Sequence, residues 1–253
     1  MKTDNIKKIV LVGHDNEGSA RLFDCIVSAY PDIDFILVIS EGLYYGKSNT
    51  ASILKLLREA SWLFVLFRFV ELVKYKIFGK SLLSLARKNG VNAIYTRDVN
   101  SRNIIEKIKT FEPDLLVSLF TMQIYKNEVL SVPRFGGITS HPSILPQYRG
   151  LEVFFWVLAN GETETGVSVF HLTNKVDSGR VFEQEVVPIN KDTSVAGLYK
   201  KITEIGGRLL VKGIHDIDSN QISYFPPKGD SSYYPMPDRA SFRRFLKTGR
   251  SLF

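Results

Sequence analysis

The stretch that most constrains the fold is 136–150 (GGITSHPSILPQYRG), a connection rich in glycine and proline. It follows, after a short turn-bounded segment, the apolar run 115–120, which is typical of a central strand in a parallel sheet. Pro142 and Pro146 hold the residues before them in extended geometry, so the connection is stiff. We therefore expect His141 at the carboxyl end of a strand, where ligands bind in open α/β sheets.

Apolar runs and helical patterns alternate along the rest of the chain. Strands are expected at 8–13, 34–40, 91–95, 115–120, 164–172 and 180–188, and helices at 18–29, 100–111, 151–159 and 194–214. This alternation indicates an α/β protein whose central, mostly parallel sheet is flanked by helices. From Asp218 onward Pro and Tyr become frequent. We expect one α/β domain at 1–215, followed at 216–253 by an extended tail with a short basic helix.

Composition narrows the kinds of partner. The net charge of +7 favours acidic partners, although an ordinary solvated surface explains it equally well. The single Cys25 excludes an internal disulfide and suits a reducing compartment, and the polar start resembles no secretory signal, so we expect a cytoplasmic location. The sequence shows no zinc-type spacing of Cys and His and no basic motif with an aromatic platform for nucleic acid, so neither is predicted.

The segment 43–90 is predicted to be a helical insertion, and its part from Ser61 to Phe78 is strongly apolar and aromatic. Arg68, Glu71 and Lys74 interrupt it, so it is not a convincing membrane span. These charges gather on one side of a helix and leave a broad apolar face. That face is predicted to pack on the protein's own core, to form a homodimer interface, or to make a peripheral membrane contact.

A second polar loop follows the strand expected at 164–172. It places Asp177 immediately before Ser178 and Gly179, and another strand follows. A carboxylate beside an imidazole orients the ring and favours its protonated form. Asp177 is therefore paired with His141 as a candidate site, provided that the fold brings the two loops together.

Taken together, 141–150 (HPSILPQYRG), 161–168 (GETETGVS) and 177–179 (DSG) resemble the folate-dependent formyltransferases. That family includes glycinamide ribonucleotide, methionyl-tRNA and amino-sugar formyltransferases, and the resemblance extends over about residues 8–210. It implies a Rossmann-like formyltransferase fold and 10-formyltetrahydrofolate as the donor of a formyl group to an amine.

The resemblance also implies a catalytic set. In the family an Asn, a His two residues later and an Asp in the second loop act on the formyl group. His141 and Asp177 occupy the His and Asp positions, and Thr139 stands where the family has the Asn. The implied roles are an oxyanion stabiliser and proton carrier for His141, its charge partner for Asp177, and a weakened or substitute hydrogen-bond donor for Thr139.

Position in the family pattern implies the binding residues as well. Residues that would line the pterin pocket are Met122, Gln123 and Ile124, and residues whose backbone would wrap the pterin are Thr173, Asn174, Lys175 and Val176. Acceptor contacts are assigned to Gly18, Ser19, Arg149 and Gly150. The first two belong to a glycine-bearing turn that can present N–H groups to a phosphate, with an ordinary capped helix start as the alternative. Met122 and Ile124 are equally compatible with core packing.

We predict formyl transfer from 10-formyltetrahydrofolate to a primary amine of a small molecule, such as an amino sugar or a phosphorylated amine. Too little chain follows residue 214 for the additional domain of methionyl-tRNA formyltransferases, which counts against tRNA as the acceptor. Two alternatives stay open. One is a 10-formyltetrahydrofolate hydrolase. The other, suggested by Thr139, is a protein that binds folate or a partner and catalyses little.

Overall fold

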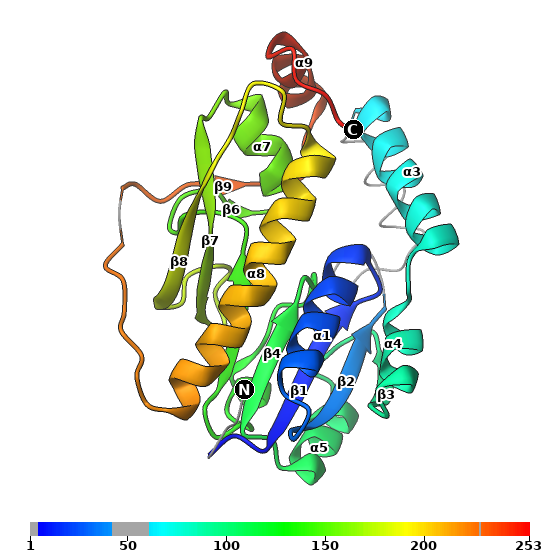
Figure 1. The fold of residues 1–253 in the computed structure, drawn as a ribbon, viewed down its shortest axis with the longest axis vertical. Helices are drawn as coiled ribbons and strands as arrows, with labels where there is room; N and C mark the ends of the chain where they lie inside the picture. Colours follow the sequence, from blue (N-terminus) through cyan, green and yellow to red (C-terminus); the bar gives the residue numbers. More distant parts are fainter. Residues whose placement is uncertain (1–4, 42–60, 228) are drawn as a thin grey trace.

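The computed structural model describes residues 5–41, 61–227 and 229–253, which form a sheet covered by helices on both faces (Figure 1). The sheet has seven strands in the order β3-β2-β1-β4-β5-β7-β8. Their bounds are β1 Lys8–His14, β2 Asp34–Ser40, β3 Asn92–Thr96, β4 Leu115–Leu119, β5 Gly137–His141, β7 Glu164–His171 and β8 Val181–Pro188. The first five strands pair in parallel and β7 and β8 antiparallel, which confirms the predicted mostly parallel sheet.

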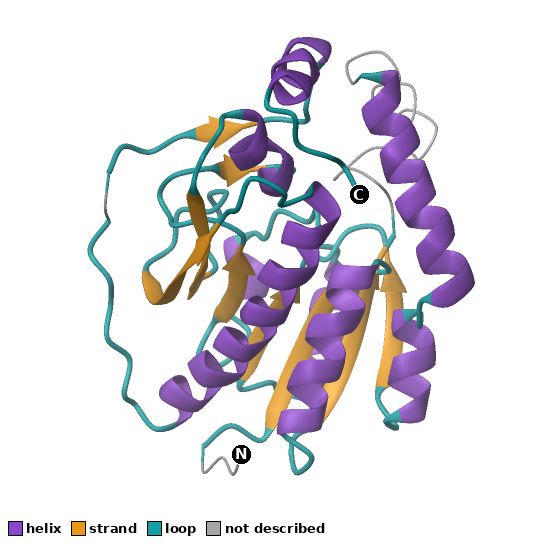
Figure 2. Ribbon diagram, turned by 45° about the horizontal axis from the view of Figure 1, so that its top comes forward, coloured by secondary structure: helices purple, strands orange, loops and turns teal. Residues whose placement is uncertain are grey.

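Helices cover the sheet in two layers. The helices are α1 Glu17–Ala29, α3 Trp62–Phe78, α4 Leu82–Lys88, α5 Arg102–Phe111, α6 Asn127–Leu130, α7 Val153–Ala159, α8 Val195–Asp218 and α9 Arg239–Lys247. In Figure 2, α1 and α8 lie side by side on one face of the sheet, and they share one core cluster with alternate residues of the strands. Ile104 and Ile108 of α5 recur at helical spacing and are buried against the other face of the sheet.

Strand β4 is buried from end to end, as its unbroken apolar sequence predicts. Its Val117 packs under α1 and α8, whereas Leu116 packs under α5, because successive strand residues point to opposite faces. Strand β5 pairs in parallel with β4, so both strands end at the same edge of the sheet. That edge carries His141, the last residue of β5, as predicted.

Helix α3 confirms the predicted helix at 61–78, while the predicted insertion from 43 to 60 lies outside the described residues. One face packs on the core: Phe64 is fully buried, and its ring lies 5.3 Å from that of Phe155 in α7. The opposite face exposes Trp62, Leu66, Phe69, Val73 and Ile77, and Leu72 and Phe78 are exposed as well. Among the described residues, no helix is both long enough and apolar enough to span a membrane.

The tail after α8 packs on the α/β domain. Strand β9 (Tyr233–Tyr234) pairs in parallel with the two-residue strand β6 (Arg149–Gly150), next to the site expected at His141. Helix α9 buries Phe242 and Phe245 against Phe155, with the Phe242 and Phe155 rings stacked at 6.1 Å. The expected basic helix at 239–247 thus docks by its apolar stripe.

Candidate active site

The two predicted loops meet at the carboxyl edge of the sheet. His141 Nδ1 lies 3.5 Å from Asp177 Oδ1, and the two side chains are only 8% and 17% exposed. Polar side chains that are this deeply buried need further hydrogen bonds to satisfy their remaining polar atoms. Both partners have such a bond: His141 Nε2 donates to the carbonyl of Tyr148 at 2.8 Å, and Asp177 Oδ2 accepts from the Gly150 N–H at 2.9 Å.

These contacts form a closed ring of interactions. Tyr148 and Gly150 belong to one short segment, so the same piece of backbone orients both the imidazole and the carboxylate. Because Nε2 faces a carbonyl oxygen and Nδ1 faces a carboxylate, the arrangement accommodates a proton on each ring nitrogen. The 3.5 Å separation of Nδ1 and Oδ1 exceeds the usual 2.7–3.2 Å of a hydrogen bond. The Nδ1 side of the ring can therefore serve a further acceptor.

Thr139 lies two residues before His141 in β5 and thus faces the same side of the sheet. Its hydroxyl donates to the carbonyl of Ser118 in β4 at 3.0 Å. A hydroxyl has a single proton to donate. In this geometry the Thr139 proton is directed at the neighbouring strand, and the role of Thr139 as an oxyanion donor stays a prediction.

Gly18 and Ser19 have structural roles in this fold, and the phosphate contacts assigned to them stay a prediction. The Gly18 N–H faces the hydroxyl of Tyr199, and a Cβ at Gly18 would stand 2.3 Å from that oxygen. Burial raises the pKa of Tyr199 to about 12, so this hydroxyl stays protonated. Ser19 is fully buried, its N–H binds the capping side chain of Asn16, and its hydroxyl donates to the Leu119 carbonyl. The alternative of an ordinary capped helix start describes this turn.

The segment predicted to line the pterin pocket follows β4. Gln123 is bound to the preceding loop, since its side chain accepts from the Val99 N–H at 3.1 Å and donates to the Arg97 carbonyl at 3.3 Å. Met122 is half-buried, and Ile124 is exposed, so Ile124 is not a core residue. The lining role of these three side chains stays a prediction.

The loop predicted to wrap the pterin is exposed and held in shape by its own side chains. Thr173 accepts from the Lys175 N–H at 3.3 Å and contacts the Ser178 hydroxyl at 3.2 Å, and Val176 is 41% exposed. Thr173 and Asn174 line a hollow of about 350 Å³ together with residues of α6. Its volume is within the roughly 300–1,000 Å³ of small-molecule sites. The hollow also contacts Leu172, whose N–H donates to the carbonyl of Gly137 at the start of β5 at 2.7 Å.

Arg149 lies between Tyr148 and Gly150, the two residues whose backbone binds His141 and Asp177, and its side chain carries an unsatisfied donor. Its Nε is buried without a hydrogen-bond partner in the described part of the chain. A guanidinium is always charged and donates to carboxylate or phosphate in a planar fork. Arg149 thus offers a group suited to an anion beside Gly150, whose N–H already binds Asp177.

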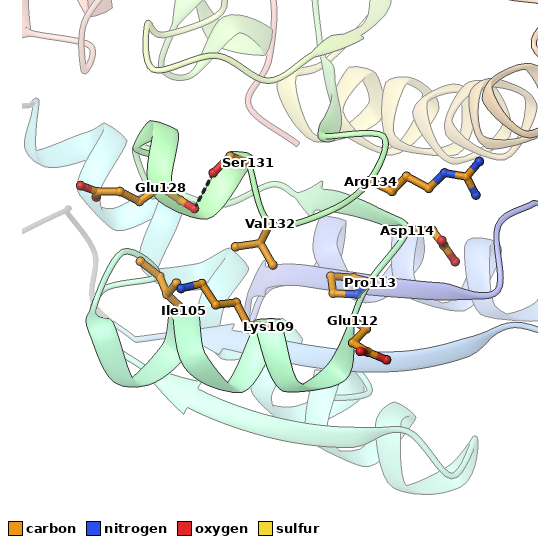
Figure 3. A pocket seen from close by; sticks show the side chains of 9 residues that line it. All are labelled: Ile105, Lys109, Glu112, Pro113, Asp114, Glu128, Ser131, Val132 and Arg134. Carbon is orange, nitrogen blue, oxygen red and sulfur yellow. Dashed lines mark hydrogen bonds between the residues drawn. The ribbon is translucent and has the colours of Figure 1, made fainter.

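A larger hollow lies away from these residues (Figure 3). It measures about 590 Å³ and is lined by charges of both signs, among them Lys109, Glu112, Asp114 and Arg134. Asp114 precedes β4, so this hollow is at the amino edge of the sheet, opposite His141. The Asp114 carboxylate accepts the N–H groups of Lys7 and Lys8 and thereby fixes the start of β1. We assign no chemistry to this hollow.

The geometry defines an α/β protein with a buried His–Asp pair at the carboxyl edge of its sheet. Residues 72–214, more than half of the chain, match the formyl transferase family. The chain belongs to this family, as the three sequence motifs predicted.

Curated relatives agree with that assignment. The chain is 31% identical over 159 residues to the bifunctional polymyxin resistance protein ArnA of Wigglesworthia glossinidia brevipalpis, covering 63% of this chain and 24% of that protein. It is 33% identical over 141 residues to the methionyl-tRNA formyltransferase of Halalkalibacterium halodurans, covering 56% and 44%. The chain spans less than half of the length of either relative.

Solved structures share the fold. The glycinamide ribonucleotide transformylase 1 of Symbiobacterium toebii superposes with a TM-score of 0.63 at 17% identity, covering 89% of this chain and 98% of that one. The N-formyltransferase of Helicobacter canadensis, solved with folinic acid and dTDP-3-aminofucose, gives 0.59 at 22% identity, covering 90% and 70%.

Sequence reasoning missed the backbone that completes the site. The carbonyl of Tyr148 and the N–H of Gly150 bind the His141–Asp177 pair, and Ser232 of the tail binds the Tyr148 N–H at 2.8 Å. Backbone groups leave no trace in residue type. The only available signal was the position of Tyr148 and Gly150 within the 141–150 motif.

Proposed function

We propose that this protein transfers a formyl group from 10-formyltetrahydrofolate to a primary amine of a small molecule. The observation that carries the proposal is the buried His141–Asp177 pair, oriented on both sides by the 148–150 backbone. Membership of the formyl transferase family supports it. A cytoplasmic location belongs to the same proposal and is supported by the lone Cys25.

The residues of the site have separate roles in this proposal. When bound, 10-formyltetrahydrofolate supplies the formyl group. The N–H at Nδ1 of His141 stabilises the negative charge that develops on the formyl oxygen as the amine attacks. Asp177 holds the imidazolium, and it accepts, through water, the proton that the attacking amine must lose. As the bond between the amine and the formyl carbon forms, the bond from that carbon to N10 of the folate would break, and the same proton would pass to N10. The Gly150 N–H keeps one carboxylate oxygen in place, so that the other faces the ring.

An acceptor with an anionic group suits the surroundings best. Arg149 carries the buried Nε without a partner, and the chain has a net charge of +7. A phosphate or carboxylate of the acceptor would satisfy this guanidinium in a planar, paired geometry. We therefore favour an amino sugar on a nucleotide carrier, or a phosphorylated amine, as the acceptor.

The engaged hydroxyl of Thr139 favours a second candidate function, that of a slow enzyme or a folate-binding protein. One experiment separates the candidates. Consumption of 10-formyltetrahydrofolate is followed spectrophotometrically with and without a panel of anionic amines. Transfer predicts consumption that depends on the amine and yields an N-formyl product. Consumption without an amine, with release of formate, would instead identify a hydrolase, and folate binding without consumption would identify a binding protein.

His141→Ala is the control for the chemistry. It removes the predicted oxyanion donor while a surface substitution such as Lys200→Ala, on the exposed side of α8, leaves the site unchanged. We expect His141→Ala to lower kcat by about 10²–10³. Equal rates for His141→Ala and the wild type would refute the assigned role.

A further inference from the structure

The C-terminal tail contacts the loop that carries His141. The Tyr148 N–H donates to Ser232 Oγ at 2.8 Å, and the Arg149 N–H donates to the Ser232 carbonyl at 2.9 Å. Directly after β6, the Leu151 N–H donates to the Tyr234 carbonyl at 2.9 Å. The tail thus binds this loop through three backbone N–H groups, those of residues 148, 149 and 151, on β6 and its flanks.

The same tail also contacts the strands that carry the Asp177 loop. The Phe225 N–H donates to the Val181 carbonyl of β8 at 2.8 Å. The guanidinium of Arg180 lies 3.4 Å from the centre of the Tyr224 ring, a cation–π contact. The Tyr224 hydroxyl is 3.4 Å from Nε2 of His171, which ends β7. Between residues 224 and 234 the tail therefore touches both loops of the site.

Backbone N–H groups alternate in direction along a strand, and this alternation links the tail to the N–H of Gly150 that binds Asp177. In an extended backbone the N–H groups of residues i and i+2 point to one side and that of residue i+1 to the other. Arg149 and Leu151 direct their N–H groups at the tail, so the N–H of Gly150 between them points away from it, at Asp177. The pairing with β9 therefore fixes the direction of the group that binds the catalytic carboxylate.

Aromatic packing reinforces the pairing. The Tyr148 and Tyr234 rings stack with centroids 4.7 Å apart, and Asn160 donates to both hydroxyls. The Tyr148 hydroxyl donates in turn to Glu162 at 2.5 Å. Tyr148 is thereby held at its ring by α7 and the tail, at its N–H by Ser232, and at its carbonyl by His141.

We propose that β9 and Ser232 are positioning elements of the active site, which align Tyr148 and Gly150 so that His141 and Asp177 are held in one orientation. This inference rests on the proposed formyl transfer. The tail lies beyond residue 214, where the match to the formyl transferase family ends, so this device belongs to the part of the chain that the family match does not cover.

Adjacent serines provide a matched test. Ser232→Ala removes the acceptor of the Tyr148 N–H, and Ser232→Thr keeps it. Ser231→Ala is the control, because the Ser231 hydroxyl only reaches the Pro146 carbonyl at 3.4 Å. We expect Ser232→Ala to lower kcat about tenfold with the Kd for 5-formyltetrahydrofolate unchanged. Ser232→Thr should recover most of the rate, and Ser231→Ala should match the wild type.

Nitrogen-15 NMR of the histidine side chains gives a readout that needs no turnover, with the His141 signals assigned from His141→Gln. A shift of these signals in Ser232→Ala but not in Ser231→Ala supports the positioning role, even if no acceptor is turned over and the proposed function fails. Unshifted His141 signals in Ser232→Ala overturn the inference, whether or not kcat falls, because the tail would then not orient the imidazole.

A separate observation concerns the exposed face of α3. Trp62, Phe69 and Phe78 are 70, 59 and 83% exposed, and Trp62, Leu66, Phe69, Val73 and Ile77 recur at helical spacing as one stripe. At ~200 Å² for an aromatic side chain, Trp62 and Phe69 of this stripe offer roughly 260 Å². Leu66, Val73 and Ile77 raise the apolar area of the stripe to about 410 Å² at the ~100 Å² implied for each when fully exposed. A standard interface buries ~800 Å² on each partner, so the stripe supplies about half of one.

We infer that this stripe is the interface with a second copy of the chain. A two-fold axis through the middle of α3 would pair the stripe with itself in antiparallel orientation. The charges favour a protein over an anionic lipid surface, since the cations of α3 already face carboxylates. Arg68 lies 3.5 Å from Glu152, Lys74 lies 3.6 Å from Glu71, and Lys76 lies 2.9 Å from Asp15.

Sedimentation equilibrium of the full chain tests this inference. The wild type should be a dimer at micromolar concentration, Phe69→Glu a monomer, and Leu246→Glu, at an exposed apolar position on α9, still a dimer. The circular dichroism of all three should agree. A monomeric wild type would overturn the inference. So would a Phe69→Glu dimer. A monomer that binds phosphatidylglycerol vesicles through Phe69 would assign the stripe to a membrane surface instead.

Discussion

Thr139→Asn is the most informative substitution at the site. It replaces a hydroxyl that is already engaged in a hydrogen bond by a side chain with two N–H donors. The Thr139 hydroxyl donates its only proton to the Ser118 carbonyl at 3.0 Å. An Asn side chain at the same position of β5 can keep that bond with one N–H and direct the other toward the His141 side of the sheet. The variant should therefore gain an oxyanion donor without losing the contact between strands.

The expected magnitude follows from the value of such donors. Removing one from an oxyanion site costs about 2.7–4 kcal/mol, or 10²–10³ in kcat. Gaining one at a half-buried strand position should raise kcat by about 10². The assay is amine-dependent consumption of 10-formyltetrahydrofolate, with the Kd for 5-formyltetrahydrofolate measured in parallel and expected to stay constant.

Thr139→Val is the matched control, since it keeps the shape of threonine and removes the hydroxyl. It should leave kcat nearly unchanged and lower the free energy of unfolding by about 1 kcal/mol, the value of one hydrogen bond. Two results would refute the reasoning: an Asn variant no faster than the wild type, or a folded Val variant that has lost its activity. The second would show that the threonine hydroxyl is itself the donor.

Further predictions concern the charge partner, a glycine and a buried carboxylate. Asp177→Asn should lower kcat by about 10²–10⁴, with folate affinity retained, in the same assay. Gly150→Ala should destabilise the protein by about 1–3 kcal/mol in urea unfolding. The reason is that φ of Gly150 is +103° and that a Cβ would stand 2.3 Å from the Tyr234 carbonyl oxygen. Unchanged stability of this variant would argue against the β6–β9 pairing. Burial raises the pKa of Asp15, but hydrogen bonds from the Leu82 N–H, Lys76 and Tyr75 outweigh it and hold the pKa below 3.8. Its stabilisation is thus present above pH 3.8 and lost as pH falls through the lower folded pKa. Asp15→Asn should therefore be less stable than the wild type at pH 7, and this difference should shrink toward pH 3.

The sequence predicted those parts of the fold that depend on local pattern. The continuous apolar run at 115–120 became the central strand β4, and the prolines after His141 correctly placed that residue at a strand end. Strands β6 and β9 have two residues each, too few to produce any periodicity, so their pairing was not predicted.

Long-range contacts explain which features of the site could not be predicted. Gly18 and Ser19 stand in a turn that suits a phosphate, but Tyr199 from α8 occupies the space in front of Gly18. No local pattern reveals that approach. The engaged hydroxyl of Thr139 was equally hidden, because its partner is a backbone carbonyl of the neighbouring strand.

The central claim, a folate site beside His141 and Asp177, is tested most directly by calorimetric titration with 5-formyltetrahydrofolate. The wild type should bind with a micromolar Kd, and Asn174→Trp, in the loop predicted to wrap the pterin, should bind at least tenfold more weakly. No heat of binding at millimolar folate would mean that this fold has no folate site, and the proposed formyl transfer would be wrong.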